Sequence, residues 1–120
     1  MNRHEAERQG RGAERRAAWL LRAKGYRILE SRFKTPVGEV DLIARRGSVI
    51  AFVEVKMRGD LGASLEAVTA RQRHRIARAA EAFLKTLPEG GARFSVRFDL
   101  IALAPGRLPR HVADAWRPGG

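Results

Sequence analysis

The chain has 120 residues, with 24 Lys and Arg against 13 Asp and Glu, and it has no cysteine. This length predicts one domain, 1–120, that buries its own core, and the missing cysteines exclude disulfide scaffolds, thiolate metal sites and cysteine nucleophiles. The formal net charge of +11 favours an anionic partner, either nucleic acid or a membrane surface. Because 20 of the basic residues are Arg, genome composition is an alternative source of that charge.

No run of 18 apolar residues is present, so we expect no membrane span and no membrane partner. The first twelve residues are polar and lack the apolar core of a signal peptide, which predicts a cytoplasmic protein. We expect the charged residues 1–11 to be flexible and residues 106–120 to form a tail rich in Pro and Gly.

The first predicted element is a helix from about Gly12 to Lys24 that ends at Gly25. Its apolar residues recur at spacings of three and four, at Ala13, Ala17, Leu20 and Leu21. Partial alternation then predicts a strand over Tyr26–Lys34, followed by a turn at Thr35–Gly38.

Two runs rich in β-branched residues, Glu39–Ala44 and Val49–Val55, predict a hairpin. Thr69 is a suitable N-cap for a helix that ends near Leu87, and strict alternation predicts a last strand over Phe94–Ala102. The order of helix, three strands, helix and strand favours an α/β or α+β fold with a mixed sheet.

The hairpin has a register that can be derived from its loop. If Gly47 and Ser48 form a two-residue loop, Arg46 pairs with Val49 and opposed residue numbers sum to 95. Asp41 then lies opposite Glu54. One face carries the charged residues Glu39, Asp41, Glu54 and Lys56, and the other face carries Val40, Leu42, Val53 and Val55.

Opposed carboxylates have Cβ atoms about 5 Å apart and repel each other unless a cation or a basic side chain lies nearby. Asp41 and Glu54 suit a hard divalent ion such as Mg²⁺, and Lys56 points the same way as Glu54. Such a set is suited to metal-assisted phosphodiester hydrolysis. The alternative is a solvated charged face in which Glu39 and Lys56 form an ordinary cross-strand pair.

The segments Gly38–Arg45 and Phe52–Arg58 resemble the YraN family of bacterial proteins. Its members are similar to nucleases of the restriction-endonuclease-like, PD-(D/E)XK superfamily and to archaeal Holliday-junction resolvases. The resemblance implies an α/β fold with a central mixed β-sheet flanked by helices. Met57 departs from the pattern, because the family usually has a small polar residue there.

The resemblance also implies a role for each residue of the motif. Asp41 and Glu54 match the two acidic metal ligands, and the backbone carbonyl of Val55 would complete the set around Mg²⁺ or Mn²⁺. Lys56 matches the lysine that positions the attacking water. Glu14 matches an additional acid close to the metal, and the alternative for Glu14 is a surface glutamate.

A basic cluster marks the start of the second long helix. Phosphate binding is favoured there by the free N–H groups of a helix N-terminus as well as by the charge. The predicted contacts to the DNA backbone are Arg71, Gln72, Arg75 and Arg78, and the alternative is a solvated basic face. Asp99 is predicted to pair with a neighbouring Arg, while Trp19 and Trp116 are predicted to pack rather than stack on bases.

The favoured hypothesis is therefore a metal-dependent endonuclease for branched or otherwise structured DNA, with RNA as the alternative partner. The competing hypotheses are a non-catalytic nucleic-acid-binding module and a subunit that is activated by a partner. Because junction resolvases act as dimers, the oligomeric state stays open between a monomer and a homodimer.

Overall fold

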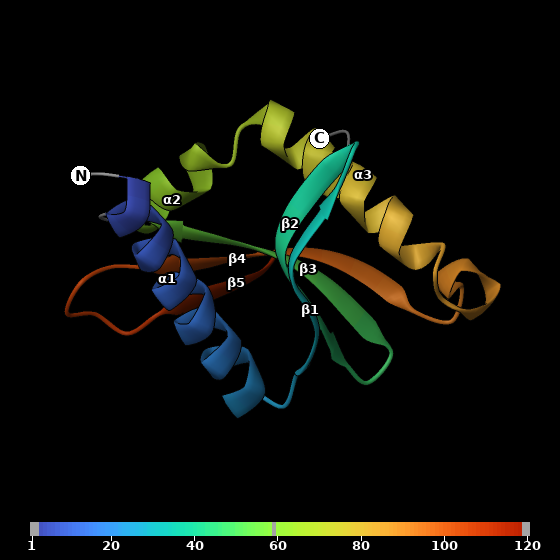
Figure 1. Cartoon of the computed structure of the whole chain (residues 1–120). Helices are drawn as coiled ribbons and strands as arrows, with labels where there is room; N and C mark the ends of the chain where they lie inside the picture. Colours follow the sequence, from blue (N-terminus) through green and yellow to red (C-terminus); the bar gives the residue numbers. More distant parts are fainter. Residues whose placement is uncertain (1–2, 59, 119–120) are drawn as a thin grey trace.

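The computed structural model describes residues 3–58 and 60–118, which form a five-stranded sheet with helices on both faces (Figure 1). In chain order the elements are α1 (Arg3–Ala23), β1 (Arg27–Thr35), β2 (Gly38–Arg46), β3 (Val49–Met57), α2 (Leu61–Ala67), α3 (Ala70–Leu84), the 3₁₀ turn η1 (Pro88–Gly91), β4 (Ser95–Leu103) and β5 (Arg110–Trp116).

The sheet is mixed, as predicted. The strand order is β1-β2-β3-β4-β5, and only the pair β3–β4 is parallel. A parallel pair needs a crossover connection, which α2, α3 and η1 provide. The described part of the chain therefore has the predicted α/β architecture, which is compatible with a restriction-endonuclease-like fold.

The ends of the helices agree only in part with the sequence prediction. α1 begins at Arg3, so the predicted start at Gly12 is wrong, and the residues from 3 to 11 that we expected to be flexible belong to this helix. Residues 1 and 2 lie outside the described residues. α1 ends as predicted at Gly25, whose φ of +92° is one that glycine adopts readily. Thr69 caps α3, since its side chain accepts a hydrogen bond from the Gln72 N–H at 3.1 Å.

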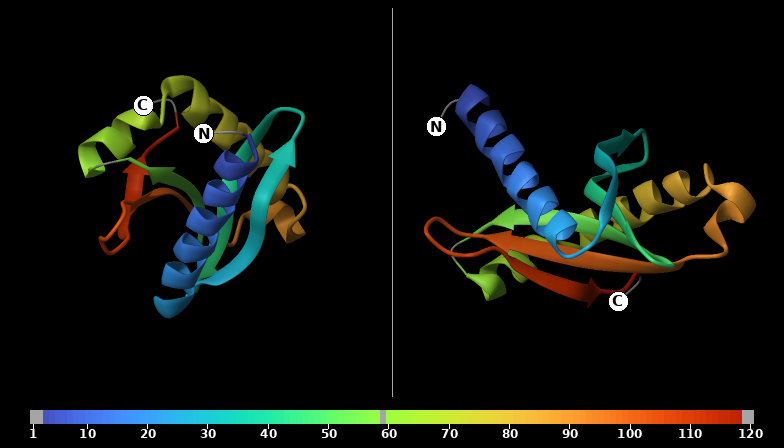
Figure 2. Two further views of the ribbon diagram at one scale, coloured as in Figure 1. Left: turned by 60° about the vertical axis from the view of Figure 1, so that its left-hand side comes forward. Right: turned by 90° about the horizontal axis from the view of Figure 1, so that it is seen from below.

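A core cluster lies on each side of the sheet, and in the left view of Figure 2 α1 crosses in front of the sheet while α3 runs behind it. On one side, α1 packs on alternate residues of the central strands through Ala13, Ala17, Leu21, Leu42, Val53 and Ile101. On the other side, α3 packs on the intervening residues through Ile76, Ala80, Phe83, Ile43, Phe52 and Leu100. Burial of both sheet faces explains why β3 is an almost continuous apolar run.

The C-terminal strand β5 was not predicted, because it lies in the segment expected to be a tail. It pairs antiparallel with β4 at the edge of the sheet, and its register shifts between Phe98 and Leu100. Only a few of its side chains are buried, so the strand lacks the alternation that would reveal it in the sequence. Trp116, predicted to pack, is 5% exposed and lies against the ring of Phe98.

The predicted hairpin register is confirmed from Arg46↔Val49 to Leu42↔Val53. Beyond that pair β2 leaves β3, and Figure 1 shows the β1–β2 end rising toward α3 while β3 continues toward α2. The predicted common face of Val40 and Leu42 is wrong, because Val40 packs in the α3-side cluster and Leu42 in the α1-side cluster.

The bend in β2 coincides with a left-handed residue on β1. Arg32 has a φ of 53°, and it lies between the residues paired with Leu42 and Val40. Left-handed backbone is uncommon outside glycine, and it turns the strand more sharply than extended backbone does. Among the described residues, no helix is long and apolar enough to cross a membrane.

Candidate active site

Beyond their last paired residues, β2 and β3 remain connected through the side chain of Asp41. The Oδ2 atom of Asp41 accepts a hydrogen bond from the Val55 N–H at 2.8 Å. The Asp41 carboxylate thus occupies a place where a backbone carbonyl would stand in a regular ladder. The opening between β2 and β3 is therefore lined by a charged group rather than by backbone alone.

Glu54 lies beside Asp41 and is 8% exposed. Burial, the negative charge of Asp41 and a hydrogen bond with Asp41 raise the pKa of Glu54 to about 9. Lys56 opposes this shift, since its Nζ lies 3.5 Å from an Oε of Glu54. Glu54 therefore holds a proton at neutral pH, and the structure brings the predicted acidic pair and the lysine together.

Glu14 reaches the same place from α1. Its side chain is 15% exposed, and burial together with the charge of Asp41 raises its pKa. Its partner is Arg32, whose Nε lies 3.4 Å from a Glu14 carboxylate oxygen. Glu14 is therefore a half-buried acid next to Asp41, and it is joined to an arginine that the sequence did not single out.

The donor chemistry of the site fits a hard divalent cation. Burial and the charge of Asp41 keep a proton on Glu54, and a divalent cation would replace that proton. Mg²⁺ commonly takes one or two carboxylates and fills its other positions with water and substrate phosphate. In residues 3–58 and 60–118, no group of three or more His, Cys, Asp or Glu side chains could hold a metal. The site therefore fits a cation that is held by two carboxylates and completed by water and phosphate.

The predicted DNA contacts on α3 have several different surroundings. Arg75 pairs with Glu39 at 2.6 Å, and this pairing lowers the pKa of Glu39. The alternative pair of Glu39 with Lys56 is therefore wrong, because the bend carries Glu39 toward α3. Arg78 contacts Glu81 at 3.3 Å, and Arg71 is exposed. Gln72 has a buried Oε1 without a hydrogen-bond partner among the described residues.

Two residues near the site were missed or misread in the sequence. The sequence did not indicate a role for Arg32, because its left-handed backbone is rare for Arg and because its contact with Glu14 depends on the tertiary fold. Trp19 was predicted to pack, yet it is 71% exposed.

Asp99 does pair with a neighbouring Arg, as predicted, through two hydrogen bonds of 2.8 Å from Arg97.

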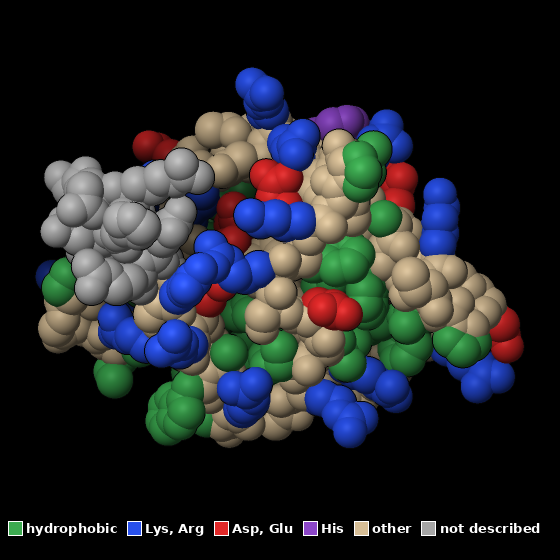
Figure 3. Space-filling view, in the orientation of Figure 1, with side chains coloured by type: hydrophobic (Ala, Val, Ile, Leu, Met, Phe, Trp, Pro, Cys, Tyr) green, Lys and Arg blue, Asp and Glu red, His purple; other side chains and the backbone are tan. Residues whose placement is uncertain are grey.

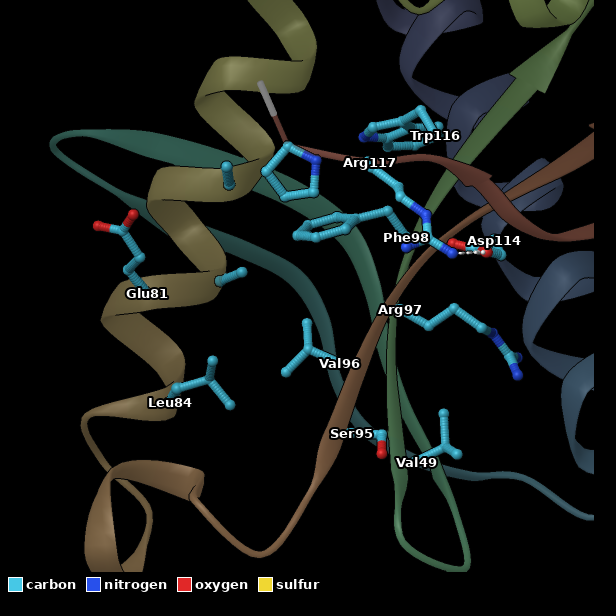
Figure 4. Close-up of a pocket in the computed structure, with 13 residues that line it drawn as sticks. Val49, Glu81, Leu84, Ser95, Val96, Arg97, Phe98, Asp114, Trp116 and Arg117 are labelled. Atoms are coloured by element: carbon cyan, nitrogen blue, oxygen red, sulfur yellow. Dashed lines mark hydrogen bonds and ion pairs between the residues drawn. The ribbon is translucent and has the colours of Figure 1, made fainter. Parts of the chain in front are cut away.

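A large open groove lies elsewhere, between α3 and the strands β4 and β5 (Figure 4). It has a volume of about 710 Å³ and a mostly apolar lining that includes Leu84, Val96, Phe98 and Trp116. None of the predicted site residues lines it. Asp41 instead borders two smaller, more polar hollows beside α1.

The fold and the site define an α/β protein with a mixed five-stranded sheet and a buried acidic pair at the opening of its central hairpin. The model of the family described as "Uncharacterised protein family UPF0102" matches residues 13–103, which include every predicted site residue. The chain belongs to this family, UPF0102, the YraN family that the hairpin motif resembles.

Relatives match this chain over nearly its full length. A UPF0102 protein of Erythrobacter litoralis is 50% identical over 118 residues, which cover 98% of this chain and 100% of the relative. One from Paramagnetospirillum magneticum is 53% identical over 116 residues, or 93% of this chain and 89% of the relative. One from a Bradyrhizobium species is 55% identical over 111 residues, or 92% and 81%.

Proposed function

We propose that this protein is a Mg²⁺-dependent endonuclease that hydrolyses phosphodiester bonds in branched or otherwise structured DNA. One observation carries the proposal, namely the contact of the half-buried Asp41 carboxylate with the buried Glu54 carboxylate beside Lys56. In this protein of net charge +11, Lys56 lies 3.5 Å from Glu54, yet burial and the charge of Asp41 still raise the pKa of Glu54 to about 9. A buried pair of this kind is costly for the fold, and a role in binding a cation explains why it is there.

The residues of the chain have separate parts in the proposed reaction. Asp41, Glu54 and the Val55 carbonyl would hold Mg²⁺ or Mn²⁺, and the bound cation would supply charge stabilisation at the phosphate and a lower pKa for the attacking water. Lys56 is placed to orient the attacking water or to donate a hydrogen bond to a phosphate oxygen. Glu14 would stay next to Asp41, where Arg32 holds it.

Basic side chains surround the acidic pair and would position the substrate. Arg32 and Lys34 line one hollow at Asp41, and Arg58 lines the other. Arg75 is joined to the rim of the first hollow through Glu39. These cations would contact phosphates without reading the bases, which suits recognition of DNA shape.

Cleavage assays test the proposal. Purified protein is incubated with Mg²⁺ or Mn²⁺ and linear, flapped and four-way-junction DNA, with the same substrates in RNA as a comparison. We expect metal-dependent cleavage that falls at least ~100-fold in Asp41→Asn, Glu54→Gln and Lys56→Met, because each change removes a group that acts on the reacting phosphate or water. Glu81→Gln, which removes an exposed carboxylate on α3, is the matched control and should cleave like the wild type.

A non-catalytic nucleic-acid-binding module is the second candidate. The observation that favours it is that the described residues form no metal-holding group of three or more acidic, His or Cys side chains. It predicts binding of the same DNA with no cleavage under any metal. Cleavage that persists unchanged in Asp41→Asn and Glu54→Gln would show that the protein is a nuclease but that these two residues are not its active site.

A further inference from the structure

A groove runs along the outer side of α1, next to the acidic pair. It has a volume of about 570 Å³ and is formed by α1 and by the bent part of β1. Its lining residues are Arg11, Glu14, Arg15, Ala18, Trp19, Arg22, Ser31 and Arg32. In Figure 3, which has the orientation of Figure 1, Lys and Arg side chains crowd the face formed by α1 and β1, with a few carboxylates between them.

Trp19 is the unusual residue of this groove. α1 buries its apolar residues against the sheet, whereas Trp19 is 71% exposed and stands among arginines. An exposed indole contributes little to folding, because it stays in water. On a basic surface it is the group on which an unpaired base can stack, while Arg side chains hold the phosphates on either side.

The groove shares lining residues with the two hollows at Asp41. Glu14 and Arg32 line the α1 groove and also the first hollow at Asp41. Asp41 and Glu14 in turn line the second hollow, together with Lys56. A strand lying in the α1 groove would therefore reach the proposed cleavage site along one surface.

We infer that the α1 groove binds a single strand of DNA, with an unpaired base stacked on Trp19 and the backbone held by Arg15, Arg22 and Arg32. The substrate class is then DNA in which unpaired nucleotides adjoin the scissile phosphate, as in a flap or an opened branch. This inference rests on the proposed nuclease function, since it assigns the substrate of that site. It adds a binding surface on α1 to the one predicted on α3.

A second copy of the chain is the other occupant that an exposed tryptophan suggests. In a symmetric dimer through this face, the arginines of one copy would meet those of the other. Among the residues whose side chains the structure describes, Glu14 is the one acid that lines the groove, and it is already paired with Arg32. Like charges across an interface oppose association, so the charge of the groove favours a polyanion.

Binding in EDTA tests the groove without any cleavage. Fluorescence anisotropy measures the dissociation constants of labelled single-stranded oligo(dT) of about 15 nucleotides and of a duplex of equal length. We expect Trp19→Ala to weaken single-strand binding about 10-fold and duplex binding less than twofold, because stacking needs an unpaired base. Trp19→Phe keeps an aromatic face and should recover most of the affinity. Leu108→Ala, which removes an apolar side chain exposed on the connection between β4 and β5, is the control.

Intrinsic fluorescence gives a second readout. The two tryptophans of the chain are Trp19, which is exposed, and Trp116, which is buried. Oligo(dT) should quench the wild type and leave the emission of Trp19→Phe unchanged. Circular dichroism should show unaltered folding in every Trp19 variant.

The outcomes separate the two proposals. Single-strand affinity in Trp19→Ala within twofold of the wild type, or an equal loss for duplex, overturns the inference whether or not the enzyme cleaves. A drop in molar mass on sedimentation in Trp19→Ala also overturns it, in favour of an interface between copies. Trp19-dependent binding without any metal-dependent cleavage would support the groove and refute the nuclease.

Discussion

The carboxyl group of Glu54 lies between Asp41 and Lys56, and these surroundings determine how its charge depends on pH. Its pKa is about 9 in the folded protein, against an ordinary value of 4.5. A raised carboxyl pKa means that the folded state binds a proton more tightly than the unfolded state. The stability that this proton provides is fully present below about pH 4.5 and is lost as pH rises toward 9.

Glu54→Gln should therefore stabilise the metal-free protein at alkaline pH. Glutamine resembles the protonated carboxyl but has no charge to desolvate, so we expect a gain in the free energy of unfolding of about 2 kcal/mol near pH 8 and almost none near pH 4.5. Urea denaturation in EDTA at the two pH values measures this. Glu81→Gln is the control, and a gain that is equal at both pH values would contradict the assignment.

Asp99 shows the opposite behaviour on the α1 face of the sheet. Burial alone would raise its pKa, but hydrogen bonds from His111 and Arg97 and from the Asp114 N–H bring it down to about 2. Its contribution to stability is present above about pH 4 and is lost as pH falls toward 2. The network also ties β4 to β5, since His111 and Asp114 lie on the edge strand.

We expect Asp99→Asn to lower the free energy of unfolding by about 3 kcal/mol at neutral pH, because it leaves Arg97 and His111 without a charged partner. Chemical denaturation measures this loss, and the loss should shrink below pH 4. Asp114→Asn is the matched control, because this carboxylate is half exposed and forms an ion pair with the exposed Arg117. A loss below 1 kcal/mol for Asp99→Asn would mean that water replaces the network easily.

At the level of elements, the contact between β2 and α3 sets the opening of the hairpin. Gly38 is buried, and a Cβ atom there would lie 1.9 Å from the Arg75 carbonyl oxygen. We expect Gly38→Ala to destabilise the fold by about 3 kcal/mol, since backbone rather than a flexible side chain must move. Thermal unfolding checks this. Gly12→Ala is the control, because a Cβ there meets nothing within 4 Å, and it should raise stability by about 0.5 kcal/mol.

The contact between β2 and α3 also explains which parts of the site could be predicted from the sequence and which could not. The register of the hairpin followed from a two-residue loop in which Gly47 has a φ of 61°, so the approach of Asp41 and Glu54 could be derived. The bend at Arg32 and the pairing of Glu39 with Arg75 could not, because they depend on the packing of β2 against α3. β5 was missed for a related reason, since an edge strand buries too few residues to show alternation.

At the level of the whole molecule, the net charge is +11, and two groups of basic side chains contribute to it, one on α3 and one on α1. Composition alone did not separate nucleic acid from any other anion. We propose nucleic acid because Trp19 is exposed among the arginines of α1, and because Glu14 and Arg32 line both that groove and the hollow at Asp41. Binding through these arginines releases counterions from the nucleic acid.

The salt dependence of single-strand binding should report those arginines. We expect the double variant Arg15→Ala/Arg22→Ala to reduce the slope of log affinity against log salt by about 1.4, or roughly 0.7 for each phosphate that is no longer neutralised. Anisotropy titrations between about 50 and 200 mM salt measure the slope. Arg107→Ala, on the exposed connection between β4 and β5, should leave it unchanged, and an equal change there would indicate a general charge effect.

Calorimetric titration with Mn²⁺ tests the assigned metal site most directly. Because the pKa of Glu54 is raised to about 9, metal binding near pH 7.5 should release about one proton, seen as a dependence of the binding heat on the ionisation enthalpy of the buffer. Asp41→Asn and Glu54→Gln should each weaken binding at least ~10-fold. Two results would show that the acidic pair is not the metal site. One is metal binding to the wild type without proton release, and the other is metal binding by both variants as tight as that of the wild type.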